Sequence, residues 1–473
     1  MPCARVDFVV LPANRPLGGV VSTPGDKSIG HRALIVGALG EGACCIAGLS
    51  NGADNLRTIE ALRGLGVEIE QKPEGVIVHG VGLSGFRAPT APLDCGNSAT
   101  SMRLLAGVLA AQPFRATLVG DDSLGRRPMR RIVAPLTTMG ASLHGRPGKN
   151  PDEEYPPLTI AGGRLSGCCH RLPFASGQVK SALLLAGIFA DGPTEIHEPF
   201  RSRDHTERLL AHLGAPLTMT ATASATDPQR LRRTFGHGIR TVSVRIDPRG
   251  WDRRLRLRFL TVPGDPSSAA FVLAAALLVG TSEEGVLIEG VCVNHTRTGF
   301  LDAVTRMGAQ VSLENQRVMA GEPVADVLVV GGPAKLRAIA VEGEAVVRTV
   351  DEIPILAVLA AKASGCTVIR DAEELRVKES DRVATTVRML RSFGVTVEEN
   401  ADGLAIDGQP GCLFSAGEVD SAGDHRIAMA AAVAALGGSG TTIVRSVANV
   451  ATSFPAFAAV MGQLGAQITA VLV

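Results

Sequence analysis

The sequence of 473 residues lacks several features on which whole classes of protein depend. Aromatic residues make up only 3% of it, with one Trp and one Tyr, which disfavours recognition of bases or sugars by stacking. Positive and negative side chains nearly cancel, at 47 Lys and Arg against 46 Asp and Glu, so no overall charge attracts nucleic acid or an anionic membrane. The longest apolar runs, at 269–280 and 427–437, are too short to span a bilayer.

The cysteines and the start of the chain indicate a compartment. The nine cysteines form an odd set without a C-x-x-C pair or a metal-like spacing, which is typical of free thiols in a reducing environment. The first residues lack the apolar segment of a secretory signal peptide. We therefore expect a cytoplasmic protein that binds neither membrane nor nucleic acid.

The signatures of common nucleotide-binding and hydrolase sites are missing as well. A P-loop needs glycine directly before its lysine, and here Asp26 precedes Lys27. No G-x-G-x-x-G follows a predicted strand, and no Ser or Cys motif resembles a hydrolase nucleophile elbow. These absences disfavour mononucleotide, dinucleotide and acyl-enzyme chemistry.

A short tag, made of a large apolar residue, Gly, and then Ala or Val, recurs along the chain. Each copy follows an amphipathic segment typical of a helix and precedes an alternating segment typical of a strand, and glycine suits the end of a helix. The tag glycines are 71 to 94 residues apart, at Gly66, Gly140, Gly214, Gly308, Gly394 and Gly465. The pattern predicts six repeated units of about 75 residues.

The helices that carry the tag have one polar face and are therefore expected on the surface, and a second series of helices alternates with them. These segments are apolar on every side, which predicts helices buried on every side, and they begin at Arg32, Ala99, Gln178, Ser268, Ile355 and Arg426. We therefore predict an α/β protein of six helix-and-sheet units, with its helices enclosed by sheet. Two related Pro-Gly-Asp loops, at 23–28 and 262–267, divide it into two domains of three units each, 25–261 and 1–24 with 262–473.

The loop at 23–28 leads into the first buried helix and carries an unusual charge pattern. Ser28 is a good N-cap, so Lys27 and Arg32 are expected close to the first turn. Cations there oppose the positive end of the helix dipole, an arrangement that suits a bound anion. For this segment alone, a solvated loop with an extended Lys and Arg is the alternative.

Polar side chains precede the other buried helices too. In the first half, amide, hydroxyl and arginine donors stand at Asn97, Arg127, Ser176, Gln178 and Arg203. In the second half, charges stand at Asp351, Glu352, Lys378, Arg382, His425 and Arg426. Lys378 and Arg382 are one predicted helical turn apart, which is unfavourable unless an anion lies between them. Both halves therefore predict a cleft between the domains that binds a small, multiply anionic ligand.

These motifs, in this order, resemble those of the 5-enolpyruvylshikimate-3-phosphate (EPSP) synthase family, the 3-phosphoshikimate 1-carboxyvinyltransferases, over essentially the whole chain. The residues that carry the resemblance are 24–28 with His31 and Arg32, 96–97 with Thr100 and Arg103, 127–129, 176–178, 375–382 and 424–426. The family's fold, two domains of three repeated units, agrees with the six tags. The resemblance implies transfer of the enolpyruvyl group of phosphoenolpyruvate to the 5-hydroxyl of shikimate 3-phosphate, with release of phosphate, in the shikimate pathway to chorismate and the aromatic amino acids. It implies no metal and no organic cofactor.

The resemblance also implies which residues meet the two substrates, each of which carries a carboxylate and a phosphate. Shikimate 3-phosphate is expected to contact Lys27, Ser28, Arg32, Ser176, Arg203, Asp351 and Lys378. Phosphoenolpyruvate is expected to contact Lys27, Asn97, Ala99, Arg127, Gln178, Arg382 and Arg426.

The expected catalytic groups are Asp351, Glu379 and Lys27. Asp351 would take the proton of the attacking hydroxyl while a protonated Glu379 delivers one to the methylene carbon, which forms a tetrahedral ketal intermediate. Elimination of phosphate reverses this proton traffic. Because neighbouring cations lower the pKa of a carboxyl, Lys27 stays open as the alternative acid.

The sequence departs from many relatives at two positions. Ala99 stands where they have Gly, which resembles the subgroup insensitive to glyphosate, an inhibitor longer than phosphoenolpyruvate. Thr452 stands where they have a lysine, which leaves phosphoenolpyruvate one cation fewer.

Two other functions fit the sequence less well. UDP-N-acetylglucosamine enolpyruvyl transferase shares the fold, but it has Asn at the position of Ser28 and lacks the run at 378–382. An anion-binding or regulatory protein is disfavoured because candidate acid, base and cations are all present. The sequence does not fix the oligomeric state, and a monomer is expected.

Overall fold

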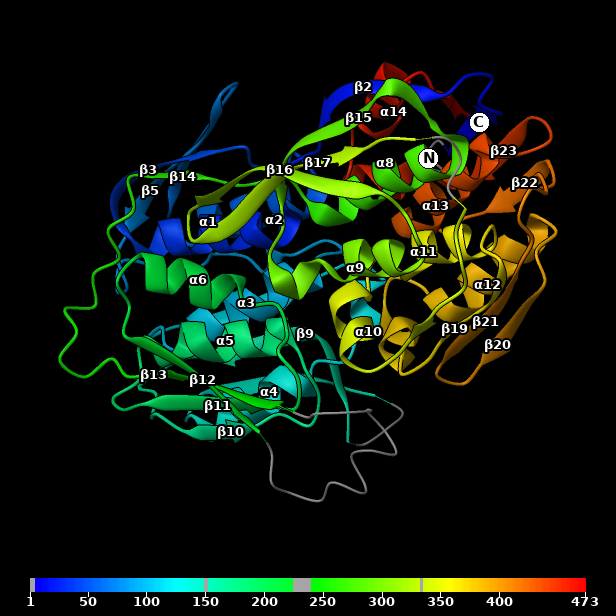
Figure 1. The fold of residues 1–473 in the computed structure, drawn as a ribbon. Helices are drawn as coiled ribbons and strands as arrows, with labels where there is room; N and C mark the ends of the chain where they lie inside the picture. Colours follow the sequence, from blue (N-terminus) through cyan, green and yellow to red (C-terminus); the bar gives the residue numbers. More distant parts are fainter. Residues whose placement is uncertain (1–4, 149–151, 224–239, 332–334) are drawn as a thin grey trace. The chain divides into compact units, whose positions relative to one another are not determined.

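The structure is a computed structural model and describes residues 5–148, 152–223, 240–331 and 335–473 (Figure 1). Its contacts divide the chain into two compact units. The N-terminal unit comprises Gly25–Val262 and Val318–Glu322, and the C-terminal unit comprises Met1–Pro24, Pro263–Arg317 and Pro323–Val473. The limits predicted from the two loops differ from these by one residue at the second loop, and they do not include Val318–Glu322 in the N-terminal domain.

Three four-stranded sheets belong to the N-terminal unit, and they share one pairing pattern. In each sheet the first strand pairs parallel with the second, and the second antiparallel with the third. In spatial order the strands are β14 (Phe259–Thr261), β3 (Glu41–Ala47), β5 (Gly75–Val81) and β4 (Glu68–Lys72); β6 (Leu93–Asp94), β7 (Arg115–Val119), β9 (Glu154–Ala161) and β8 (Ser142–Pro147); β10 (Cys169–Arg171), β11 (Thr194–Glu198), β13 (Arg240–Ile246) and β12 (Leu217–Ala223).

The apolar helices of this unit are α1 (Lys27–Leu39), α3 (Ala99–Leu109) and α5 (Gly177–Gly187), and they are buried over most of their length. Small residues let them pack closely: a Cβ at Gly107 of α3 would lie 2.2 Å from the backbone oxygen of Ala182 in α5. The tag-bearing helices are α2 (Ala53–Gly64), α4 (Arg130–Thr138) and α6 (His205–His212).

The C-terminal unit repeats this arrangement. Its sheets, in spatial order, contain β22 (Gly417–Asp420), β23 (Thr442–Arg445), β1 (Val6–Leu11) and β24 (Gln467–Leu472); β2 (Leu17–Ser22), β15 (Thr281–Cys292), β17 (Glu322–Val329) and β16 (Val311–Met319); β18 (Ala340–Val341), β19 (Gly365–Ile369), β21 (Gly403–Gly408) and β20 (Val397–Asn400). The buried helices are α8 (Pro266–Val279), α11 (Ile353–Ala360) and α13 (His425–Leu436), and the others are α9 (Gly299–Arg306), α10 (Glu344–Thr349), α12 (Arg382–Ser392) and α14 (Phe457–Gln463). The predicted six helix-and-sheet units, three in each domain, are confirmed.

The six tag glycines end helices, as predicted. Their φ angles lie between +79° and +107°, a region that glycine enters without strain. The residue after each glycine donates its N–H to a carbonyl five residues earlier, as Val67 does to Leu62 at 3.1 Å and Ala309 to Val304 at 2.9 Å. These bonds satisfy carbonyls that the end of a helix leaves open.

The chain crosses from one unit to the other at the two Pro-Gly-Asp loops. Strand β2 comes just before α1 in the chain but pairs with β15, which follows α8. Strand β14 comes just before α8 but pairs with β3, which follows α1. Each loop therefore leads from a strand of one unit into a helix of the other, and Lys27 is the first helical residue after one of these crossings.

Three local predictions were wrong. Asp26, not Ser28, caps α1, and its Oδ1 accepts the N–H of Ile29 at 2.9 Å. Lys378 does not share a helix with Arg382, because a 3₁₀ turn at Glu373–Val377 ends before it and α12 begins only at Arg382, capped by Asp381. Helix α6 is not a simple surface helix, since its polar residues His205, Thr206 and Glu207 are buried.

Candidate active site

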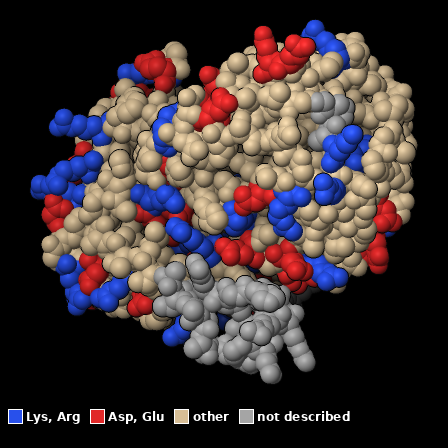
Figure 2. Space-filling view, in the orientation of Figure 1, with Lys and Arg blue, Asp and Glu red and all other residues tan. Residues whose placement is uncertain are grey.

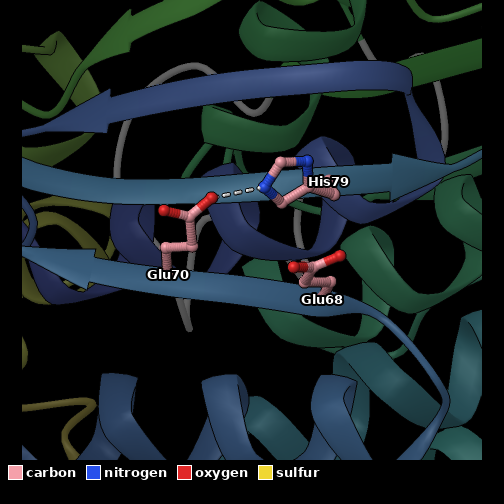
Figure 3. Close-up of side chains that lie close together, drawn as sticks. All are labelled: Glu68, Glu70 and His79. Atoms are coloured by element: carbon pink, nitrogen blue, oxygen red, sulfur yellow. Dashed lines mark hydrogen bonds and ion pairs between the residues drawn. The ribbon is translucent and has the colours of Figure 1, made fainter.

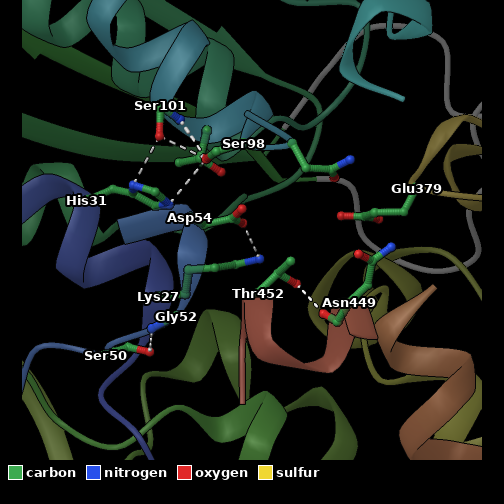
Figure 4. A network of polar contacts seen from close by, with 12 residues as sticks. Lys27, His31, Ser50, Gly52, Asp54, Ser98, Ser101, Glu379, Asn449 and Thr452 are labelled. Atoms are coloured by element: carbon green, nitrogen blue, oxygen red, sulfur yellow. Dashed lines mark hydrogen bonds and ion pairs between the residues drawn. The ribbon is translucent and has the colours of Figure 1, made fainter. Parts of the chain in front are cut away.

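Lys27 lies at the N-terminus of α1 and is held by a carboxylate. Its Nζ is 2.9 Å from Oδ2 of Asp54 in the first turn of α2, and the side chains are 18% and 11% exposed (Figure 4). An ammonium group has three protons, so it can bind a second anion beside this one. Asp54 was not predicted, because it stands in an ordinary amphipathic helix and no local pattern marks its contact.

His31 lies one helical turn after Lys27 and is fully buried. Its Nδ1 is 2.7 Å from Oγ1 of Thr58, and Ser98 and Ser101 lie at the same ring (Figure 4). Burial, and then the charges of Lys27 and Arg32, hold the pKa of His31 well below its ordinary value. The imidazole is therefore neutral near pH 7, and the positive charge at the start of α1 belongs to Lys27 and Arg32.

Arg32 is buried among neutral oxygens. Its Nε donates to Oγ1 of Thr206 in α6, and one terminal nitrogen donates to Oγ of Ser181 in α5, both at 2.7 Å. The other terminal nitrogen donates to the carbonyl of Ser28 at 2.7 Å. Burial lowers the pKa of Arg32 to about 10, so the group keeps its charge at neutral pH while no carboxylate accepts a hydrogen bond from it among the described residues.

The start of α3 brings Asn97 and Arg127 together. Ser98 caps the helix, and Asn97 accepts a hydrogen bond from Arg127 at 2.6 Å while its own amide nitrogen donates to Asp121 at 2.8 Å. Ala99 is the first residue of the helix and is 6% exposed. The predicted phosphoenolpyruvate residues of this segment are therefore neighbours.

The start of α5 is fixed through α3. Gln178 accepts a hydrogen bond from Arg103 at 2.5 Å and donates one to Thr100 at 2.8 Å, so both ends of its amide are oriented. Ser176 is the N-cap of α5. Arg203 lies beside this helix start, because a Cβ at Gly177 would come within 3.1 Å of the Arg203 Cβ.

Arg382 is the centre of a carboxylate cluster in the C-terminal unit. The guanidinium is 1% exposed and donates to Asp424 at 2.8 Å, to Glu379 at 2.6 Å and to Asp351 at 3.3 Å. Burial opposes its charge, but Asp424 and Glu379 outweigh this and raise the pKa of Arg382 above its ordinary value. Burial likewise opposes ionisation of Asp424, and Arg382 nevertheless holds the pKa of that carboxyl below its usual range.

Asp351 lies between the two cations whose spacing suggested a missing anion. Its Oδ1 is 3.3 Å from Arg382 and 3.7 Å from Nζ of Lys378. The anion between them is thus a side chain of the protein. Arg382 in turn connects Asp351 with Glu379, the two groups predicted to transfer protons.

Arg426 follows His425 at the start of α13 and contrasts with Arg382. Its side chain is 7% exposed, and a terminal nitrogen lies 4.0 Å from Oε1 of Glu352. That nitrogen is buried and has no hydrogen-bond partner in the described part of the chain. Glu352 itself accepts a hydrogen bond from Ser267. A buried guanidinium nitrogen whose hydrogens have no acceptor is suited to an anionic ligand.

Thr452 lies in the short 3₁₀ turn Ala448–Thr452 of the C-terminal unit. Its hydroxyl donates to the carbonyl of Asn449 at 2.7 Å (Figure 4). A threonine here makes a local bond and brings no charge, and the described residues show none that takes the place of the lysine expected from the resemblance.

The predicted site residues form two groups, one in each unit. The N-terminal unit contains those at or near the starts of α1, α3, α4, α5 and α6, namely Lys27, Ser28, Arg32, Asn97, Ala99, Arg127, Ser176, Gln178 and Arg203. Asp351, Lys378, Glu379, Arg382 and Arg426 belong to the C-terminal unit. Within the second group, Arg382 contacts two of the others directly.

Charged side chains of both signs are interspersed over the face drawn in Figure 2, consistent with the net charge of +1. One set of metal-ligating types lies close together in the described residues, namely Glu68, Glu70 and His79 on β4 and β5 (Figure 3). Glu70 already pairs with His79 at 2.8 Å and with Lys72 at 3.1 Å. None of these residues belongs to the predicted site, and nothing else at this place indicates a ligand.

Two further expectations can be compared with the structure. The eight cysteines among the described residues are all free thiols, as predicted. Over the same residues, no helix is both long enough and apolar enough to span a bilayer.

Comparisons with known proteins agree with the resemblance that the sequence motifs carry. The family model of EPSP synthase (3-phosphoshikimate 1-carboxyvinyltransferase) matches residues 12–461. A 3-phosphoshikimate 1-carboxyvinyltransferase of Acidithiobacillus ferrooxidans is 49% identical over 459 residues, 97% of this chain and 98% of that protein. One of Brevibacillus brevis is 45% identical over 443 residues, 94% of this chain and 96% of that protein.

Solved structures agree. An EPSP synthase from Acinetobacter baumannii has a TM-score of 0.81 at 39% identity and covers 99% of this chain and 100% of its own. The enolpyruvyl transferase NikO from Streptomyces tendae has a TM-score of 0.72 at 18% identity, with 99% and 100% covered, which shows a shared fold.

Proposed function

The chain belongs to the EPSP synthase family, and on this premise we infer that it transfers the enolpyruvyl group of phosphoenolpyruvate to the 5-hydroxyl of shikimate 3-phosphate and releases phosphate. This is the enolpyruvyl transfer of the shikimate pathway, which leads to chorismate and the aromatic amino acids. The inference rests on relatives matched over nearly the whole chain.

The geometric observation that carries the proposal is Arg426. Its guanidinium stands at the N-terminus of an apolar helix and its side chain is 7% exposed. One of its nitrogens is buried and donates no hydrogen bond to any described group. Helix N-termini and arginine both favour carboxylate and phosphate. We assign Arg426 to phosphoenolpyruvate, together with Lys27, Asn97, Ala99, Arg127, Gln178 and Arg382.

Shikimate 3-phosphate is assigned mainly to the N-terminal unit. Its contacts there are Lys27, Ser28, Arg32, Ser176 and Arg203, joined by Asp351 and Lys378 of the C-terminal unit. Arg32 supports this assignment because neutral oxygens hold it and leave its charge uncompensated by a hydrogen-bonded carboxylate among the described residues. The proposal requires residues of both units to act on one pair of substrates, in the cleft that the sequence predicts between the domains.

The chemistry is proposed to run as addition and then elimination. Asp351 takes the proton of the 5-hydroxyl while the hydroxyl oxygen forms a bond to C2 of phosphoenolpyruvate, and Glu379 gives a proton to C3. In the second step C3 returns a proton to Glu379, the bond from C2 to the phosphate oxygen breaks, and phosphate leaves. The shared contact with Arg382 supports these paired roles, since it keeps both carboxyl groups in place. Lys27, at the start of α1, is the alternative acid and stabilises the departing phosphate.

We propose that Ala99 makes the enzyme insensitive to glyphosate. Ala99 is the first residue of α3 and lies beside Asn97, which holds Arg127. Its methyl group would crowd an inhibitor longer than phosphoenolpyruvate. Replacing it, Ala99→Gly, is expected to lower the glyphosate inhibition constant by about tenfold or more while the KM for phosphoenolpyruvate changes little. An inhibition constant for the variant no lower than that of the parent would contradict this proposal.

The setting of the reaction is proposed as well. Free thiols at all eight described cysteines support a cytoplasmic enzyme. We expect it to work as a monomer on two small substrates, without nucleic acid or membrane as a partner.

The test is phosphate release from phosphoenolpyruvate with each of two acceptors. Release with shikimate 3-phosphate, and none with UDP-N-acetylglucosamine, is the expected result. Release with the UDP sugar alone would assign the chain to the fold-sharing enolpyruvyl transferase. No release with either acceptor would contradict the proposal and favour an anion-binding protein that keeps the fold.

A further inference from the structure

A buried charge cluster lies behind the starts of α5 and α6 in the N-terminal unit, and the proposed chemistry does not use it. Nζ of Lys180 in α5 is 2.7 Å from Glu198 at the end of β11 and 2.9 Å from Glu207 in α6. All three side chains are 1% exposed.

Such a cluster is not explained by stability. Removing three charged groups from water is costly, and apolar side chains of similar volume often stabilise a core as well or better. Burial raises the pKa of Glu207, and the two carboxylates raise the pKa of Lys180 to about 12 against the opposing effect of burial. The cluster is therefore expected to do something that an apolar core cannot do.

What it does is hydrogen-bond the backbone of two loops. Glu198 accepts the N–H of Ser176 at 3.0 Å, the hydroxyl of Ser202 at 2.5 Å and the N–H of Ser202 at 3.4 Å. Lys180 donates to the carbonyl of Ser202 at 3.3 Å. The amide, hydroxyl and carbonyl of Ser202 are thus all held by the cluster.

Each loop so held carries a residue assigned to shikimate 3-phosphate. Ser176 is bound directly, and Arg203 follows Ser202 in the chain. Arg203 also packs against the start of α5, where Gly177 leaves the space that a Cβ would fill.

The cluster reaches a third substrate residue through its neighbours in sequence. Ser181 follows Lys180 and Thr206 precedes Glu207, and these two hydroxyls hold Arg32 at 2.7 Å each. The Ser181 and Thr206 hydroxyls are also 2.7 Å from one another. Shifting the cluster would therefore move Ser176, Arg203 and Arg32 together.

We propose that Glu198 and Lys180 are positioning residues for shikimate 3-phosphate: they touch no substrate, but they fix the loops and helices that present Ser176, Arg203 and Arg32 to it. The proposal rests on the assignment of these three residues to that substrate. It makes no claim on phosphoenolpyruvate: Asn97 and Arg127 are held by separate contacts, and Gln178, although it lies in α5, is oriented by Arg103 and Thr100 of α3.

The test shortens the side chain of Glu198 by one methylene group and keeps the charge of its carboxylate. In Glu198→Asp the charge balance with Lys180 is kept, but one carboxylate cannot reach Ser176 and Ser202 at once. We expect the KM for shikimate 3-phosphate to rise about tenfold, the loss of one hydrogen bond to a charged group, while the KM for phosphoenolpyruvate and kcat stay within about twofold of the parent.

The matched control is Glu322→Asp. Glu322 is another buried carboxylate of the same unit, pairs with His205 at 2.8 Å, and contacts neither Ser176 nor Ser202. It is expected to lower the thermal midpoint about as much as Glu198→Asp but to raise the KM for shikimate 3-phosphate much less, although its partner His205 precedes Thr206, which holds Arg32. Should Glu198→Asp not fold, Ser202→Ala removes a single bond of the cluster and is expected to raise the same KM about threefold.

An unchanged KM for shikimate 3-phosphate in the variants, an equal rise for both substrates, or an equal rise in the control would overturn the positioning role. Phosphate release by the parent enzyme is measured first. Failure of that measurement speaks against the proposed function, whereas a parent that turns over beside an unaffected variant speaks only against the positioning role.

Discussion

The arginines near the helix starts of the two units are held in different ways. In the N-terminal unit, hydroxyl and carbonyl oxygens surround Arg32, and an amide oxygen receives Arg127. In the C-terminal unit, three carboxylates surround Arg382, and Asp351 also approaches Lys378.

This difference indicates what each group is suited to. A cation bonded to neutral oxygens keeps its charge available for an anionic substrate. A guanidinium paired with several carboxylates fixes those carboxylates, and less of its charge remains for a substrate anion. The N-terminal unit is thus suited to holding phosphate and carboxylate groups, and the cluster around Arg382 is suited to proton transfer.

Removing the lysine at the start of α1 is expected to have the largest effect. Lys27→Met deletes an ammonium assigned to both substrates and to catalysis, so turnover is expected to fall by about a thousandfold or more. The fold is expected to stay intact, because the side chain of Asp54, which loses its partner, is 11% exposed and keeps some contact with water. Lys72→Met, at an exposed lysine of the same unit, is the control and is expected to leave turnover unchanged. A Lys27→Met enzyme with a near-parental rate would refute the assignment.

Arg426 is an exception to the pattern of its own unit, and a smaller change tests it. Arg426→Lys keeps the charge but loses the planar fork that suits carboxylate and phosphate. The KM for phosphoenolpyruvate is expected to rise about ten- to a hundredfold, with little change for shikimate 3-phosphate. Steady-state kinetics with each substrate varied in turn measures this.

The control for Arg426 is Arg445→Lys, at a more exposed arginine of the same unit that pairs with Glu418. It is expected to leave both KM values unchanged. If Arg426→Lys raises the two KM values equally, Arg426 does not discriminate between the substrates and its assignment is wrong.

The smallest expected effect concerns the neutral histidine beside the cations of α1. The pKa of His31 is depressed, chiefly by burial, so below about pH 6.5 the unfolded chain takes up a proton that the folded protein does not. Its contribution therefore lowers the free energy of unfolding as the pH falls, by at most about 1.4 kcal/mol per pH unit, until the pKa in the folded state is reached. NMR of the imidazole at about pH 6 is expected to show a neutral ring. A ring that titrates near its ordinary value would contradict the account of this helix start.

Much of the fold was predictable because it rests on local patterns that repeat. Gly at the six tags and the all-apolar segments before the strands are each determined by neighbours in sequence, and the structure confirms both. The capping residue of α1 was not, because Asp26 and Ser28 are both good caps and stand two positions apart.

The site was predictable where a motif carried it and not where it depends on distant partners. Asp351 and Glu379 follow from the resemblance, whereas the contact of Lys27 with Asp54 joins two helices and leaves no local sign. The buried Lys180, Glu198 and Glu207 were missed for the same reason, since they lie on α5, β11 and α6 and meet only in the fold, and a charged side chain ordinarily faces solvent.

The central claim is that Glu379 transfers a proton and does not hold shikimate 3-phosphate. Calorimetric measurement of the dissociation constant of shikimate 3-phosphate for Glu379→Gln, beside its kcat, tests this most directly. The account predicts that kcat falls by about a hundredfold or more while the dissociation constant stays within about threefold of the parent. A dissociation constant weakened as much as kcat would contradict it, because Glu379 would then hold the substrate rather than protonate it.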